Sequence, residues 1–138
     1  MLNNRKPNSE ALDKLAGIIL GEEEALEPYF LSDYFTYYNK VIEFMPYWAE
    51  AHHVLGFLHY YSGDSNKAIE SFDKAAKIDP KHETALFNKG IVLMHDLNDL
   101  DGAIQAWQEL VKRNPAATSP TGQPVKDLVE RMKKSKKQ

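Results

Sequence analysis

The segment MHDLNDLDG, residues 94–102, carries three aspartates, an asparagine and a glycine, the residue types found in a calcium-binding EF-hand loop. Such a loop needs oxygen ligands at alternate positions and a glutamate six residues after its glycine. With the pattern aligned on the glycine, Asp99 and Asp101 occupy ligand positions, but Leu97 and Gln108 stand where two further ligands are required. The sequence therefore predicts a turn between helices, in which Asp99 or Asp101 caps the next helix.

Three of the five histidines lie close together and suggest a metal site. His52 and His59 are seven residues apart, so on a helix they would share a face, with His53 beside the first. There is no HExxH motif and no second cluster of matched carboxylates. The pattern favours histidines that serve packing, and we predict no metal ligands.

No other set of residues indicates catalysis. The chain has no G-x-S-x-G motif, no Walker loop and no glycine-rich phosphate cradle. It also has no cysteine, which excludes disulfides and thiolate chemistry. We therefore predict a non-enzymatic protein with no catalytic residues and no cofactor.

The composition is that of one globular domain, with 138 residues of which 43% are hydrophobic and 27% charged. A net charge of −3 gives no electrostatic reason to expect nucleic-acid binding. The apolar runs are far shorter than the ~20 residues of a membrane span, and the first residues lack the apolar core of a secretory signal. We expect a cytoplasmic protein, or a periplasmic or membrane-anchored one if a segment before Met1 has been removed.

A repeat organises the middle of the chain. Gly56 and Gly90 stand at equivalent positions of two similar segments, 49–80 and 83–115, and each is followed by an alanine, an aromatic residue and a proline. Each of these three lies one position farther from its glycine in the second segment, which therefore has one inserted residue. The residues concerned are Ala68, Phe72 and Pro80, then Ala103, Trp107 and Pro115.

These positions resemble the signature of the tetratricopeptide repeat, a helix–turn–helix of about 34 residues. Leu55 precedes Gly56 as in the signature, and His59 takes an aromatic position, whereas Lys89 replaces the expected leucine of the second unit. The resemblance, closest to bacterial members of the family, implies an all-α fold. It implies a short right-handed solenoid of about three antiparallel helix hairpins with a C-terminal capping helix.

The expected domain boundaries follow from this repeat. Residues 1–138 form a single domain, and Pro46, one repeat length before Pro80, closes a weaker first unit. Apolar residues recur at spacings of three and four, which indicates helices throughout. The expected units are a degenerate repeat at 9–46, a repeat at 47–80, a repeat with the insertion at 81–115 and a capping helix at 124–135.

The repeated residues also have physical roles. Gly56 and Ala68 are small where the two helices of a hairpin would cross, and we expect Phe72 and Trp107 to fill the space between successive hairpins. Prolines end the second helix of each unit, because proline cannot continue a helix. At the C-terminal end, an apolar stripe on the capping helix would cover the last hairpin. The stripe consists of Val125, Leu128, Val129 and Met132. At the other end, Ser9 would cap a helix at 10–20.

Aromatic residues are concentrated in YFLSDYFTYYNKVIEFMPYW, residues 29–48. Most fall on helical stripes that a buried helix would use, but Tyr37 and Phe44 fall on a separate face. Core packing accounts for the stripes, and Tyr37 and Phe44 form a candidate second contact patch.

In the tetratricopeptide family, the first helices of successive repeats line a concave groove that binds extended peptides or partner helices. Carried onto this chain by the helical period, the groove residues are His53, Phe57, Tyr60, Phe87, Ile91 and Met94. This groove is apolar and aromatic. Family members that hold acidic chaperone C-termini use lysine, arginine and asparagine there, and only Asn88 resembles that set.

The sequence thus predicts a non-catalytic protein–protein interaction module, an adaptor or assembly factor that holds a protein or peptide with apolar anchors. Two alternatives remain open. In the first, the groove is filled by the chain's own N-terminal helix or by a second copy in a homodimer. In the second, the chain is a soluble domain of the kind that serves cytochrome c maturation.

Overall fold

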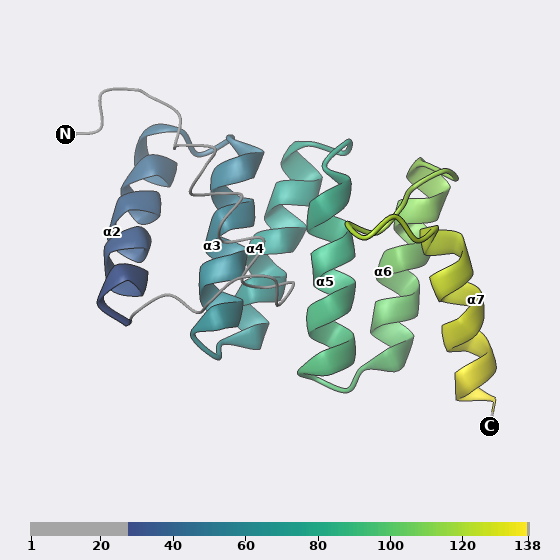
Figure 1. The fold of residues 1–138 in the computed structure, drawn as a ribbon. Coiled ribbons are helices and arrows are strands. Elements are labelled where there is room, and N and C mark those ends of the chain that lie inside the picture. The colour runs from purple at the N-terminus through teal and green to yellow at the C-terminus, as the bar shows by residue number, and fades with distance from the viewer. Residues whose placement is uncertain (1–27, 138) are drawn as a thin grey trace.

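The computed structural model describes residues 28–137, which form six helices in a row (Figure 1). In chain order they are α2 (Pro28–Phe44), α3 (Ala49–Tyr61), α4 (Ser65–Ile78), α5 (Glu83–His95), α6 (Leu100–Arg113) and α7 (Val125–Lys136). The all-helical prediction is confirmed: within residues 28–137 the only extended pairing is an isolated bridge between Thr118 and Pro124. The helix expected at 10–20 lies outside the described residues.

The described helices form two hairpins, with α2 before the first and α7 after the second. α3 packs on α4 and α5 on α6, while the contact between α4 and α5 stacks the hairpins into a short solenoid. α2 packs on α3 at one end and α7 on α6 at the other, as Figure 1 shows. Val125, Val129 and Met132 of α7 are buried and Leu128 is partly buried, so the predicted stripe covers the last hairpin.

The helix ends follow from local sequence signals. α2, α4 and α6 each end two residues before a proline, at Pro46, Pro80 and Pro115. The turns inside the two hairpins end in equivalent caps, because Asp64 accepts a hydrogen bond from the Lys67 N–H and Asp99 from the Gly102 N–H at 2.9 Å. Asp99 therefore has the capping role that the sequence predicted for this aspartate-rich turn.

The inserted residue of the second repeat lies in the turn of the hairpin. Three residues separate α3 from α4, but four separate α5 from α6. Each turn has one residue with positive φ, Gly63 at 92° and Asn98 at 50°. Asparagine adopts this left-handed conformation more readily than most residues, so the longer turn still enters α6 in the same way.

The two repeat glycines are sites of close helix contact, and here one expectation was wrong. A Cβ atom on Gly56 would lie 2.5 Å from the Phe72 ring, and a Cβ atom on Gly90 would overlap the indole of Trp107. Phe72 and Trp107 therefore lie mainly inside their own hairpins, against the glycine of the partner helix, and not mainly between successive hairpins. The reason is that glycine leaves space for a ring that no other residue would leave.

Lys89, which stands at the position of the signature leucine, has a partner on the neighbouring hairpin. Its Nζ forms an ion pair with Asp73 of α4 at 2.7 Å. The contact between α4 and α5 thus gains a charged pair where a standard repeat would place an apolar side chain.

We predict that Gly90→Ala destabilises the protein, although alanine is the better helix former by about 1 kcal/mol. The added methyl group collides with Trp107 and should cost ~1–3 kcal/mol through overpacking. Urea unfolding would measure the change. Asn66→Ala, at an exposed position of α4, is the control and should be neutral or slightly stabilising. A Gly90→Ala variant as stable as the parent would contradict the packing described here.

Candidate functional site

A groove opens where α3 and α5 meet the loop after α6. It holds a cavity of about 380 Å³. The floor includes Phe57 of α3 and Phe87 of α5, two of the residues predicted for the groove. The lining is completed by Glu83, Thr84, Asn88, Leu110, Thr118, Ser119 and Pro120.

Phe57 and Phe87 are also core residues. Phe57 is 3% exposed and meets Phe72 edge-on at 5.6 Å between ring centroids. Phe87 is 6% exposed and stacks on Trp107 at 5.1 Å, while the Trp107 Nε1–H donates a hydrogen bond to the Phe87 carbonyl. The groove floor is therefore the outer side of the hairpin cores and is held rigidly.

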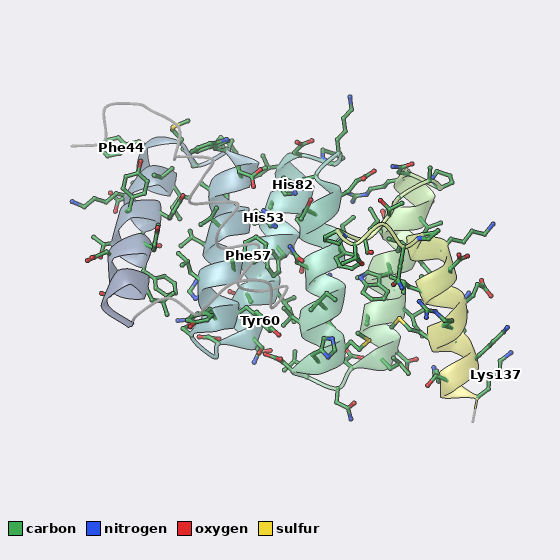
Figure 2. All side chains as sticks on the ribbon, in the orientation of Figure 1. Phe44, His53, Phe57, Tyr60, His82 and Lys137 are labelled. Carbon is green, nitrogen blue, oxygen red and sulfur yellow. The ribbon has the colours of Figure 1, made fainter. Side chains whose placement is uncertain are left out.

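The other predicted groove residues do not all join this cavity. Figure 2 shows His53, Phe57 and Tyr60 along α3. Tyr60 is partly buried and packs against the cluster of Phe57 and Phe72. Ile91 packs against the core of the second hairpin, and Met94 lines a different cavity between α5, α6 and α7.

One wall of the groove was not foreseen from the sequence. The loop at 116–124 folds back over α5, with Ala117 and Ser119 buried. Asn114 fixes its base by accepting a hydrogen bond from the Ala116 N–H and donating one to the Glu83 carboxylate. Its Pro, Ser, Thr and Gly content indicated a loop, but nothing in that composition indicates where a loop lies.

A partly buried polar cluster borders the groove and joins the two hairpins. The Glu50 carboxylate lies 3.0 Å from Nδ1 of His53 and 3.1 Å from Nε2 of His82. The two histidines are labelled in Figure 2. Nε2 of His53 lies 3.1 Å from Nδ2 of Asn88, and Nδ1 of His82 accepts the Ala85 N–H at the start of α5. The groove is thus more polar at this end than the sequence predicted.

The hydrogen-bond partners indicate the tautomer of each histidine. His82 accepts at Nδ1, so its hydrogen is on Nε2 and is donated to Glu50. His53 accepts from the Asn88 amide at Nε2, so its hydrogen is on Nδ1 and is also donated to Glu50. Glu50 accepts both hydrogens as a carboxylate. Hydrogen bonds from the two histidines hold the pKa of Glu50 well below its usual range, and burial lowers the pKa of His53.

Glu50, His53 and His82 also have the atom types of a zinc site, with ligand atoms within 4.8 Å of one another. The sequence did not group these three, because His82 is 32 residues from Glu50. The cap of α5 argues against a metal, since binding at Nε2 of His82 requires the hydrogen on Nδ1, where it would face the Ala85 N–H. The donor set therefore fits a hydrogen-bonded network better than a metal centre.

Comparison with known proteins supports the repeat found in the sequence. Models of the tetratricopeptide repeat match residues 49–82 and 84–117, which correspond to the two hairpins. The chain belongs to the tetratricopeptide repeat family. Its fold is similar to that of the type III secretion translocator chaperone SycD of Yersinia enterocolitica, with a TM-score of 0.64 and 19% identity over 100% of this chain and 92% of that chain.

That level of identity shows a shared fold only. No curated protein matches the sequence. The repeats and the fold support a protein-interaction module, and no helix in residues 28–137 is long and apolar enough to cross a membrane.

The remaining candidate residues of this tetratricopeptide protein have structural contacts. Nε2 of His52 lies 2.8 Å from the Pro46 carbonyl, and His59 meets the Phe35 ring at 5.0 Å, so both serve packing as predicted. In the aspartate-rich turn, Asp96 accepts a hydrogen bond from Ser65 and Asp101 pairs with Lys136. The first contact holds the turn to α4, and the second holds the start of α6 to α7.

The candidate second patch lies on α2 and is open to solvent. Phe44 is 64% exposed and Tyr37 is 36% exposed, and Tyr47, in the turn after α2, is 84% exposed. Tyr37 contacts the buried Tyr38 edge-on at 5.2 Å. Phe44 lies near the end of α2, remote from the His53 and Phe57 labels in Figure 2.

We predict that the tetratricopeptide domain loses stability as pH falls from 7.5 to 5.5. The pKa of His53 in the folded protein is lowered from 6.5, mainly by burial, so the unfolded chain binds the proton more readily. The contribution of neutral His53 to the free energy of unfolding is complete above pH ~6.5 and is lost as the pH falls below that value. Burial also lowers the pKa of His59, which acts in the same direction. Urea unfolding at several pH values should show the decrease.

His53→Gln should flatten this pH dependence, whereas His95→Gln, at the exposed end of α5, should leave it unchanged. A profile for His53→Gln identical to that of the parent would show that the polar cluster does not respond to pH.

We also predict that excess Zn²⁺ does not raise the melting temperature of the EDTA-treated protein, because the α5 cap requires the lone pair on Nδ1 of His82. His82→Asn, which retains a good capping residue, is the control for the cap. A saturable increase in melting temperature that disappears in His82→Asn would establish a metal site instead.

Proposed function

We propose that this chain is a non-catalytic interaction module that holds an apolar segment of another protein in the groove between α3, α5 and the 116–124 loop. The observation that carries the proposal is the cavity itself. Its floor has two immobilised aromatic rings, and its rim has exposed residues at Thr84, Thr118 and Pro120. An apolar centre with a polar rim is the usual anatomy of a protein-binding surface.

The polar groups of the cavity define the chemistry of the partner further. Asn88 is 3% exposed, and its side-chain Nδ2 lies 3.1 Å from Nε2 of His53. Among the described residues, the only charged one that lines the cavity is Glu83, which already accepts a hydrogen bond from Asn114. We therefore expect apolar anchors and neutral polar groups in the partner, and an affinity that changes little with salt.

The fold adds an analogy. SycD is a translocator chaperone, and a related role here would be to keep an apolar segment of a client protein out of solvent. At 19% identity this likeness does not select a client. The competing proposals are that the groove is occupied by the chain's own N-terminal segment, or by a second copy.

The groove can be tested without damaging its floor. Truncating Phe57 or Phe87 would disturb the hairpin cores, so the variant of choice is Thr84→Trp, which adds bulk at an exposed rim position. We expect peptides selected from a random library on the parent protein to carry spaced apolar residues and to lose at least about tenfold in affinity for Thr84→Trp. Isothermal titration calorimetry measures the loss.

Gln105→Trp makes a comparable change at an exposed position of α6 that does not line the cavity, and it should bind normally. Peptides that bind Thr84→Trp as tightly as the parent would place the binding surface elsewhere, with Tyr37 and Phe44 as the next candidates. A parent protein that is dimeric by light scattering and becomes monomeric in Thr84→Trp would show that a second copy fills the groove.

A further inference from the structure

The loop that walls the groove contains a short antiparallel pairing. The Ser119 N–H donates to the Gln123 carbonyl at 2.7 Å, and the Val125 N–H donates to the Ala117 carbonyl at 2.9 Å. These two bonds flank the bridge between Thr118 and Pro124. Thr118 and Pro124 are therefore opposite residues that exchange no hydrogen bond with each other.

This geometry leaves one backbone edge open. The N–H and C=O of Thr118 point away from Pro124, because neighbouring residues make the bonds across the pair. Neither group has a hydrogen-bond partner within residues 28–137. Ala117 and Ser119, on either side, are buried at 3% and 7% exposure, while Thr118 is exposed. The buried neighbours hold the strand in place, and its open edge is on the side away from Pro124.

The same short strand borders the proposed binding groove. Thr118, Ser119 and Pro120 line the cavity whose floor includes Phe57 and Phe87. A segment bound in this cavity would border Thr118, whose backbone N–H and C=O have no partner within residues 28–137.

We propose that the groove takes its partner as an extended strand that pairs with the backbone of Thr118. The inference rests on the proposed function and makes it more specific, since it chooses between an extended peptide and a helix. A helix satisfies its backbone groups internally and cannot use this edge, whereas an extended chain presents free N–H and C=O groups at every second residue.

The edge also limits the pairing. Pro120 has no N–H, so the next outward-facing position on the loop cannot donate to the partner. The expected contact is one exchange of two hydrogen bonds centred on Thr118. Side chains of an extended segment alternate in direction, so every second residue of the bound peptide should be apolar and face the aromatic floor.

Amide hydrogen exchange measured by NMR tests the pairing directly. The probe is a peptide selected from the random library on the parent protein that loses affinity for Thr84→Trp. We expect binding to slow exchange of the Thr118 amide at least about tenfold, since a free N–H gains an acceptor. Asn98, whose N–H also has no partner within the described residues, lies in the turn between α5 and α6 and should be unaffected.

A scan of N-methyl groups along the same peptide gives a second readout. Methylation at one position should weaken binding about tenfold by removing the hydrogen bond to the Thr118 carbonyl, while methylation at neighbouring outward-facing positions has little effect. A peptide that needs the Thr84 rim but leaves the Thr118 amide unprotected would overturn this inference and leave the proposed function standing. If no selected peptide is sensitive to Thr84→Trp, both fail.

Discussion

The close approach of an aromatic ring to a glycine is the contact on which the rest of this structure depends. It occurs twice, with Phe72 against Gly56 and Trp107 against Gly90. Each contact fixes how the second helix of a hairpin lies on the first. Because Phe72 and Trp107 occupy the inside of their hairpins, Phe57 and Phe87 are held against them and turn their other sides to the groove. The candidate binding floor is a consequence of the hairpin core.

A second layer of contacts sets how the hairpins sit relative to each other. Glu50 of α3 bonds to His82 before α5, and the Arg113 guanidinium at the end of α6 donates to the Pro80 carbonyl at 3.1 Å. Asn114 reaches Glu83 in the same region. These bonds converge on the connection between α4 and α5, so both walls of the groove share one set of supports. In a hydrogen-bonded cluster of this kind, removing one member leaves others unsatisfied.

The groove therefore has one regular and one irregular wall. Its floor comes from equivalent helices of two repeats, whereas the loop at 116–124 belongs to neither hairpin. Stacked repeats supply a floor of this general kind, and fold alone does not choose a partner. The irregular wall contributes what the repeat cannot, namely the open backbone edge at Thr118. Specificity in this chain is expected to reside there.

The sequence by itself determined the repeat and the positions of helix ends and caps. The spacing of the glycines located both hairpins, the prolines marked the ends of three helices, and the failed calcium pattern left Asp99 as a cap. Helix caps and helix ends depend on residues a few positions apart, so they can be recognised in one dimension. The buried stripe of α7 followed from its period in the same way.

Only the tertiary structure decided which side chains meet across long separations. The sequence did not show that His82 lies beside Glu50 and His53. It also did not show that Phe72 packs inside its own hairpin, or that Met94 lines the cavity beside α7 and not the groove. The repeat period places residues on a helix face but does not specify the rotation of the neighbouring helix. The 116–124 loop has no period at all, and its position over α5 is set by contacts such as that of Asn114 with Glu83. Those contacts form only after the hairpins have packed.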